Sequence, residues 1–175
     1  MASLIPFISE ILPMIMPAST HVTAAKDLQP THPTVEGPVI RRAAVVDRCD
    51  KMCASVLTTR PQSSTPVRHN SEQAQFYTLY PPRLGSSDPS LLDAIIYTVS
   101  GTGVLLVSER FEEELRRHPL TAGDFAFVPA WTEHQIENDT DSDLVMVVIQ
   151  SGSRPVGAIL TDWGGDEIAA DISTD

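Results

Sequence analysis

Positive charge is the scarcest property of this sequence. Lysine and arginine together number 12, against 23 aspartates and glutamates, which gives a net charge of −11. Nucleic acids and anionic membranes are bound through clusters of basic side chains, so this balance argues against either as a partner. Cysteine is also rare, because Cys49 and Cys53 are too few for a disulfide framework. A lone pair at this spacing is a weak zinc signal, and we expect two ordinary reduced thiols.

Long hydrophobic runs are absent as well. No stretch approaches the roughly 18 uninterrupted apolar residues of a membrane-spanning helix. The most apolar segment, residues 1–19, is interrupted by Pro6, Glu10, Pro13 and Pro17 and lacks the basic residues that begin a signal peptide. We therefore expect a cytoplasmic protein. The segment is expected to be either a short amphipathic arm that docks on a partner subunit or a disordered end.

Short apolar runs bounded by turn residues indicate an all-β fold. After the proline-rich arm at residues 1–38, several such runs follow at the spacing of a sandwich or barrel. Two glycines in residues 100–103 predict a tight hairpin, since glycine accepts the positive φ of such turns. The charged segment 109–118 is either a helical turn or a solvated hairpin end. The apolar runs lie at 38–47, 53–60, 94–99, 104–107, 124–129 and 144–149.

Two of these runs differ in the burial they predict. Residues 124–129 alternate, with Phe125 and Phe127 on one face of the strand. Residues 144–149 are continuously apolar, which is typical of a strand covered on both faces. Between them, residues 138–143 are rich in Asn, Asp and Ser, so we expect a turn whose side chains cap its own backbone.

The most specific pattern is a set of spaced residues that includes a single histidine. Gly123 is followed after five residues by Pro129, then by His134, and three residues beyond that by Asn138. Gly123 allows a turn into a strand, Pro129 ends the strand, and the next strand begins with His134 facing inward. This order resembles the second motif of the cupin superfamily (RmlC-like proteins), with Trp131 in place of the motif's middle glycine. The resemblance implies a cupin fold, which is a jelly-roll barrel or double-stranded β-helix.

The first cupin motif is much less complete in this chain. Its final glycine matches Gly101, but its metal-binding slots fall on Arg68, Asn70 and Ala94. Of the family's usual ligand set, three histidines and a glutamate, the one retained member is His134.

A better match appears when residues 68–73 are joined directly to residues 93–103. The joined string is similar to small, single-domain fungal cupins of secondary metabolism. On this interpretation the barrel spans residues 39–163, and residues 164–175 form a C-terminal tail. Residues 74–92 are then an insertion, which is either a loop over the barrel mouth or an artefact of gene prediction such as a retained intron.

The resemblance implies a divalent metal inside the barrel, with Fe, Mn, Ni or Zn as the candidates. Two histidines and one carboxylate suffice for an iron site, and zinc accepts similar ligands. The candidate ligands here are His69 and His134, with Glu72 or Gln73 completing the set. In a regular strand His69 and Glu72 point to opposite faces, whereas His69 and Gln73 share one. A set with Glu72 therefore needs a bulge, and neutral Gln73 is the weaker ligand.

Function follows from the same resemblance, and three hypotheses stay open. The first is a metal-dependent oxidoreductase, such as a dioxygenase, that acts on an aromatic or polyketide-like small molecule through His69 and His134. The second is a metal-independent isomerase, cyclase or dehydratase in which His134 moves a proton. The third is a non-catalytic cupin that binds a ligand or a partner enzyme. A homodimer is expected, because cupins commonly pair and open sheet edges need covering. The aromatic residues expected to form the substrate pocket or the core are Tyr97, Phe125, Phe127 and Trp131.

Overall fold

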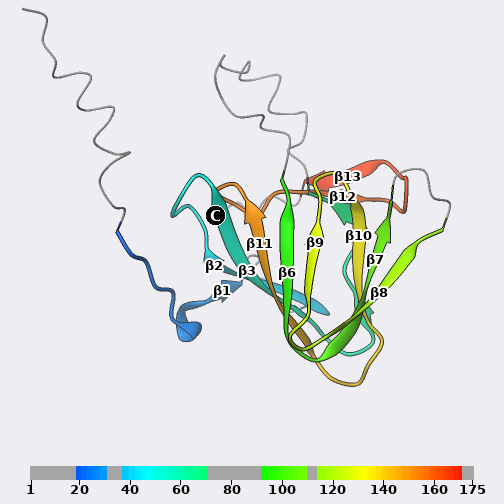
Figure 1. The fold of residues 1–175 in the computed structure, drawn as a ribbon, viewed down its shortest axis with the longest axis horizontal. Coiled ribbons are helices and arrows are strands. Elements are labelled where there is room, and N and C mark those ends of the chain that lie inside the picture. The colour runs from blue at the N-terminus through cyan, green and yellow to red at the C-terminus, as the bar shows by residue number, and fades with distance from the viewer. Residues whose placement is uncertain (1–18, 31–36, 71–91, 110–113, 171–175) are drawn as a thin grey trace, which may run out of the picture.

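The chain folds into two antiparallel sheets that face each other (Figure 1). The computed structural model describes residues 19–30, 37–70, 92–109 and 114–170. The first sheet has the strand order β1-β2-β3-β11-β6-β9, and the second has the order β13-β12-β5-β10-β7-β8, with β4 pairing to β10. The predicted all-β class is confirmed. The strands are β1 (Gln29–Pro30), β2 (Val39–Val45), β3 (Met52–Thr59), β4 (Ser63–Ser64), β5 (Arg68–His69), β6 (Ala94–Ser100), β7 (Thr102–Ser108), β8 (Arg116–Thr121), β9 (Phe125–Val128), β10 (Glu133–Asn138), β11 (Leu144–Ser151), β12 (Ala158–Leu160) and β13 (Glu167–Ala170), and a 3-10 turn, η1, spans Ala25–Asp27.

The turn at residues 100–103 is a corner between the sheets and not the predicted hairpin. β6 pairs with β9 and β11 in the first sheet, whereas β7 pairs with β8 and β10 in the second. Gly101 has a φ of 85°, and a Cβ at this position would overlap the carbonyl oxygen of Asp143. Only glycine tolerates this conformation and this close approach together. The glycines that indicated a tight turn are therefore needed for the crossing from one sheet to the other.

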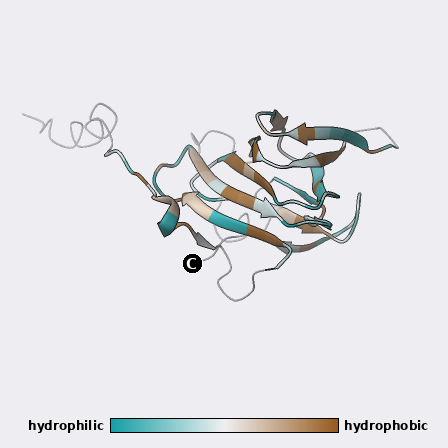
Figure 2. Cartoon of the chain, turned by 90° about the horizontal axis from the view of Figure 1, so that it is seen from below, coloured by the Kyte–Doolittle hydropathy of each residue, from teal (hydrophilic) through white to brown (hydrophobic). Residues whose placement is uncertain are grey.

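Alternation along the strands builds one apolar core between the sheets. β3 buries every second residue, and β11 does so as well, as a half-buried strand should. Figure 2 shows this pattern as apolar bands along the strands. Each fully buried aliphatic side chain contributes roughly 1.5–3 kcal/mol relative to exposure. The core includes Leu57, Ile96, Leu105, Ile136, Leu144 and Met146.

The outward side of β11 is more exposed than the sequence predicts. Its continuous apolar run predicts a strand covered on both faces, but Val145, Val147 and Ile149 point outward, and Ile149 is 37% exposed. An apolar run shows that both faces are apolar, and it does not identify what covers the second one. The described parts of the chain leave this face open to solvent at Ile149.

The turn between β10 and β11 is organised by its own side chains, which confirms the sequence prediction. The amide of Asn138 donates to the carbonyl oxygens of Thr59 and Ser142, each at 2.8 Å. Its Oδ1 accepts hydrogen bonds from the backbone N–H and the hydroxyl of Thr140. The buried Asn138 side chain therefore fixes the turn and attaches it to β3.

The described end of the charged segment, Arg116–His118, belongs to β8, which lies beside β7 in the second sheet. Arg116 pairs with Glu109 at 3.0 Å, and Arg117 pairs with Glu137 at 3.1 Å. Of the two predicted alternatives, the described residues favour a solvated hairpin end over a helical turn. Within the described ranges, no helix has the length and apolar character needed to cross a membrane.

Strand pairing continues beyond the predicted barrel limits at both ends of the chain. β1 pairs with β2, and β13 pairs with β12. The predicted insertion at residues 74–92 falls almost entirely outside the described residues.

Candidate functional site in the barrel interior

A small cavity lies inside the barrel, with polar side chains among the aliphatic residues that line it. Its volume is about 20 Å³, which leaves room for one or two water-sized groups. Polar groups in an apolar core cost free energy unless they are paired or serve a ligand, so their gathering here marks the cavity as the candidate site. The polar residues that line it are Arg41, Thr65, Arg68, Asn70, His134 and Gln150.

His134 has the clearest chemistry in this cavity. It is 5% exposed and lies directly opposite Arg68 across the β10–β5 pair. Its Nδ1 lies 2.9 Å from the carbonyl oxygen of Thr132. Because a carbonyl oxygen only accepts, Nδ1 carries the proton of the neutral ring, and Nε2 keeps its lone pair. Burial away from water, and then the charges of Arg68 and Arg41, lower the pKa of His134 to about 3. The ring is therefore neutral near pH 7, with Nε2 available as a base or a ligand.

Two guanidinium groups bring positive charge to the same cavity. Arg41 and Arg42 are neighbours in β2 and point to opposite faces, and Arg41 is the one that lines the cavity. Arg68 is 6% exposed. Its guanidinium packs against the backbone of Gly157, where a Cβ would come within 2.9 Å of Nη2. The missing side chain at Gly157 therefore makes room for Arg68 beside His134.

Two buried amides complete the polar wall, and each is 2% exposed. The Nε2 of Gln150 donates to Asn70 Oδ1 at 3.1 Å and to the carbonyl oxygen of Val156 at 3.1 Å. Among the described residues, Asn70 Nδ2 and Gln150 Oε1 have no hydrogen-bond partner. Buried amide groups are rarely left without a partner, so a water or a bound ligand is expected beside them.

The second predicted histidine points away from this cavity. His69 follows an inward residue in β5, so its side chain emerges on the other face of the sheet. Its Nε2 lies 3.2 Å from Oε1 of Glu167 in β13, and its ring centroid is 5.2 Å from that of Trp131. The described cavity therefore contains His134 and not His69, although the charge of His69 is among the causes that lower the pKa of His134.

The donors around the cavity do not fit the divalent metal that the resemblance implies. No group of three or more His, Cys, Asp or Glu side chains comes together in the described part of the chain. The predicted ligands Glu72 and Gln73 lie outside it. The first-motif slots Arg68, Asn70 and Ala94 do line the cavity, but a guanidinium, an amide and a methyl group do not replace histidine and carboxylate ligands. Arginine charges also oppose a cation at this place.

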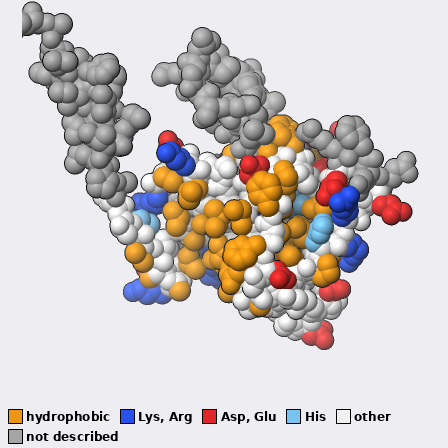
Figure 3. Space-filling model, viewed as in Figure 1, with side chains coloured by type: hydrophobic (Ala, Val, Ile, Leu, Met, Phe, Trp, Pro, Cys, Tyr) orange, Lys and Arg blue, Asp and Glu red, His pale blue; other side chains and the backbone are white. Residues whose placement is uncertain are grey.

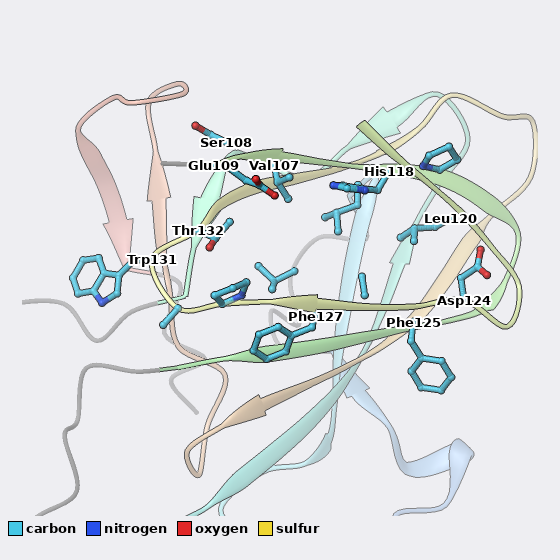
Figure 4. A pocket seen from close by; sticks show the side chains of 16 residues that line it. Val107, Ser108, Glu109, His118, Leu120, Asp124, Phe125, Phe127, Trp131 and Thr132 are labelled. Carbon is cyan, nitrogen blue, oxygen red and sulfur yellow. The ribbon is translucent and has the colours of Figure 1, made fainter. Parts of the chain in front are cut away.

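A larger cleft of about 810 Å³ opens where the two sheets end, between β9 and the β7–β8 pair (Figure 4). Val107 and Leu120 form part of its inner wall. Phe125 and Phe127 also border it, but their rings point away from it and are 70% and 62% exposed. Tyr97 stacks on Phe125 with ring centroids 4.5 Å apart. These three predicted pocket residues therefore lie mainly on the outer face of the first sheet.

Trp131 occupies a backbone conformation that normally belongs to glycine. Its φ is 65°, which costs a side-chain-bearing residue about 1–2 kcal/mol. This is the position at which the cupin motif has a glycine. Its backbone N–H donates to the carbonyl oxygen of Asn70 at 3.1 Å, and its ring is 44% exposed beside His69. Strain of this kind persists where the surrounding structure holds it, as at functional sites.

Three polar residues of the cavity were not predicted from the sequence, namely Thr65, Arg41 and Gln150, and the sequence carries a signal for the last two. Arg41 and Arg42 are adjacent inside an apolar strand, and alternation forces one of them inward. Gln150 continues the buried phase of Leu144 and Met146 along β11. A polar residue at an inward position of an apolar strand is the pattern that would have found both Arg41 and Gln150.

Comparisons with known proteins agree with the fold. Residues 88–150 match the family described as Cupin domain, whereas no curated protein matches the chain. The fold is similar to an RmlC-like cupin protein from Ralstonia eutropha, with a TM-score of 0.58 and 16% identity over 89% of this chain and 81% of that one. It is also similar to a Klebsiella pneumoniae protein with a double-stranded β-helix domain, with a TM-score of 0.55 and 12% identity over 81% and 97% of the two chains.

A third similar structure is a complex of Lactobacillus farciminis oxalate decarboxylase with formate. The TM-score is 0.59 and the identity 16%, over 79% of this chain and 35% of that one. The present chain thus spans about a third of the decarboxylase. Identities this low establish the fold alone. The chain therefore has the cupin fold, and residues 88–150 match the Cupin domain family.

Proposed function

We propose that this chain is a metal-independent cupin enzyme that holds a small oxo acid in the barrel interior and moves a proton with His134. The observation that carries the proposal is the placement of a neutral imidazole, two arginines and an unpartnered amide donor around one buried cavity. Guanidinium and amide N–H groups are the donors that bind carboxylates best. The metal-dependent oxidoreductase predicted from the resemblance is not proposed, because the described donors do not fit a divalent metal.

The proposed step is a proton transfer next to a carbonyl group. Arg41 and Arg68 hold the carboxylate of the substrate, and Asn70 Nδ2 donates to its carbonyl oxygen. Nε2 of His134 accepts a proton from the neighbouring carbon, and the electron pair of the broken C–H bond moves to the carbonyl oxygen, forming an enolate. Return of the proton to the same carbon gives exchange or racemisation, and return to another position gives isomerisation.

The base strength of His134 depends on the charge of the bound molecule. With a pKa of about 3 the free imidazole is a weak base. An anion beside the two arginines offsets their charge, which raises the pKa of His134 toward the range in which a general base is effective. The substrate therefore activates the base by binding, and uncharged analogues should react more slowly.

The size of the cavity limits what enters it. At about 20 Å³, the cavity as described takes one carboxylate or carbonyl group, so the proposal requires the side chains around it to move apart when a small oxo acid binds. A whole aromatic or polyketide-like molecule would insert only its anionic end. The structurally similar enzyme from Lactobacillus farciminis is an oxalate decarboxylase in complex with formate.

Pyruvate in D₂O tests the proposal, because its methyl protons exchange when an enolate forms. We expect the full-length chain to speed this exchange, measured by proton NMR, and we expect EDTA to leave the rate unchanged. The H134Q variant should lose the exchange. R41Q should weaken pyruvate binding at least tenfold, whereas R42Q, which changes the outward neighbour in β2, should not. Exchange that requires an added metal, or that survives in H134Q, would refute the proposal.

A binding protein without catalysis is the second candidate. The low pKa of His134 favours it, because so weak a base leaves the imidazole a hydrogen-bond acceptor. In that case calorimetry would show pyruvate or formate binding that R41Q weakens, while the methyl protons of pyruvate would not exchange in the wild-type chain.

A further inference from the structure

One buried hydrogen-bond acceptor of the cavity is not used by the proposed proton transfer. It is Oε1 of Gln150, which has no hydrogen-bond partner among the residues that the structure describes. The neighbouring Ile149 points outward, on the side of the sheet where hydrophobic side chains gather in Figure 3. Gln150 points inward and is 2% exposed. A buried acceptor without a donor costs free energy, so this oxygen indicates a further group that the site binds.

The orientation of the Gln150 amide is fixed by its neighbours. Its Nε2 lies 3.1 Å from the carbonyl oxygen of Val156 and 3.1 Å from Oδ1 of Asn70. Because a carbonyl oxygen only accepts hydrogen bonds, the nitrogen of the Gln150 amide must face Val156. Both N–H groups of this nitrogen are then in use, so Asn70 must present its oxygen to Gln150. Oε1 of Gln150 is therefore an acceptor that needs a donor, and Nδ2 of Asn70 is a donor that needs an acceptor.

A simple oxo acid does not supply the missing donor. Its carboxylate and carbonyl oxygens only accept hydrogen bonds, and the proposed function places them at the arginines and at Nδ2 of Asn70. The partner of Gln150 Oε1 must therefore be an O–H or N–H group of the bound molecule. An ammonium group would be repelled by the guanidinium groups of Arg41 and Arg68, which line the same cavity. A hydroxyl group is small, uncharged and able to donate, so it fits this position best.

We infer that the molecule bound in the barrel is an oxo acid with a hydroxyl group that donates to Oε1 of Gln150. The inference rests on the proposed function and names the substrate class of the same site. Because the amides of Asn70 and Gln150 are hydrogen-bonded to each other, the two groups that they contact belong on adjacent carbons. The hydroxyl group is therefore on the carbon next to the carbonyl. With the carbonyl beside the carboxylate, as in pyruvate, the substrate is a 3-hydroxy-2-oxo acid.

A hydroxyl group at this position selects isomerisation among the outcomes of the proposed step. Nε2 of His134 takes a proton from the carbon that carries the hydroxyl group, and the electron pair of this C–H bond forms a carbon–carbon double bond as the carbonyl electrons move to oxygen. The hydroxyl proton passes to that neighbouring oxygen, and His134 returns its own proton to the former carbonyl carbon. The product is a 2-hydroxy-3-oxo acid with the same atoms and electrons, so the step needs no oxidant or reductant.

Calorimetry with two acids that cannot form an enolate through a ketone tests the hydroxyl contact. Propionate differs from 3-hydroxypropionate only in lacking the hydroxyl group, so it leaves Oε1 of Gln150 without a donor. We expect the full-length chain to bind 3-hydroxypropionate roughly tenfold more tightly than propionate. In the Q150M variant, which keeps the length of the side chain but removes the amide, the two affinities should agree within about twofold.

Two controls accompany this variant. R41Q should weaken both acids and leave the ratio of their affinities unchanged, because Arg41 is placed at the carboxylate that the two acids share. Q62M is the matched control for the loss of a glutamine amide. The Nε2 of Gln62 also donates to two acceptors, which are backbone carbonyl oxygens in the turn after β10, but Gln62 does not line the cavity. Q62M should therefore change neither affinity.

The results separate this inference from the proposed function. Equal affinities for the two acids in the wild type would overturn the inference, because a water molecule would then be the partner of Oε1. The exchange of pyruvate protons is measured separately and would stand. A difference in affinity that Q150M leaves unchanged would also overturn the inference. Binding of neither acid would overturn the proposed anion site together with the inference.

Proton NMR with 3-hydroxypyruvate follows the isomerisation itself. We expect the wild type to convert the methylene signal into the signals of the product. Q150M should slow this reaction roughly tenfold more than it slows the exchange of pyruvate methyl protons, because pyruvate has no hydroxyl group to lose its contact. Equal slowing of the two reactions would contradict the inference. Circular dichroism checks that Q150M is folded, and if it is not, the two affinities of the wild type decide.

Discussion

Replacing His134 by glutamine should flatten the dependence of stability on pH in the mildly acidic range. In the folded chain the pKa of His134 lies at about 3, against 6.5 for an exposed imidazole. Between these values the unfolded chain binds a proton at this residue and the folded chain does not. The unfolded state is therefore favoured as the pH falls from 6.5 toward 3, and the stability associated with the neutral buried ring is fully present only above pH 6.5.

The magnitude follows from the pKa difference. One pH unit corresponds to about 1.4 kcal/mol for a group that is protonated in the unfolded state alone. Between pH 6.5 and 4.5 the wild type should therefore lose roughly 2–3 kcal/mol of unfolding free energy through His134. Many small domains have a total stability of only about 5–15 kcal/mol, so the loss should be readily measured.

Urea unfolding at several pH values, followed by circular dichroism, provides the assay. For each protein, the free energy of unfolding is plotted against pH. The slope of the wild type is then compared with the slope of H134Q, because carboxylates and the other histidines contribute equally to both slopes. H118Q, which removes an imidazole on the exposed surface of β8, controls for the loss of one ring. Equal slopes in the wild type and H134Q would refute the assignment of His134 as a neutral buried group. Nitrogen NMR would show its proton on Nδ1 if the hydrogen bond to Thr132 is as described.

Three further outcomes test local features. Alanine at Gly101 should destabilise the fold by about 1–3 kcal/mol more than alanine at Gly123. Both glycines have positive φ, but only Gly101 lies against another backbone segment. Urea unfolding of the two variants would show the difference. At Trp131, glycine should be more stable than alanine by about 1 kcal/mol, which reverses the usual order because φ is 65°; equal unfolding midpoints would contradict this. Iodoacetamide should modify Cys49 in the native protein and spare Cys53, which is 2% exposed and whose pKa burial raises to about 11; two adducts by mass spectrometry under native conditions would be inconsistent with this burial.

The sequence reveals most strands of this fold because alternation and turn residues are local signals. It does not reveal which strands pair. Gly101 needs positive φ equally well in a hairpin and in a corner between sheets, and only the close approach to Asp143, far along the chain, distinguishes the two. The continuous apolar run of β11 likewise identifies a strand with two apolar faces, but the sequence does not show that one face meets solvent.

The candidate site was predictable in part for a related reason. The spacing from Gly123 to Asn138 places His134 on an inward strand position, and the structure has it beside the cavity. The phase of the short strand β5 was not determined by any such spacing, and a shift of one residue exchanges His69 for Arg68 at the inward position. Because of that shift, the interior carries positive charge opposite His134 where a second imidazole was expected.

The strand origins of the cavity residues have a consequence for how this protein gains and loses activity. Arg41 and Gln150 come from the first sheet, and Arg68 and His134 from the second. Contacts between segments so distant in sequence form late in folding, after loop-closure entropy has been overcome. Separation of the sheets by a partial opening would disperse these four groups while most backbone hydrogen bonds within each sheet survive. On mild heating, ligand binding should therefore fail at a lower temperature than the far-ultraviolet circular dichroism signal.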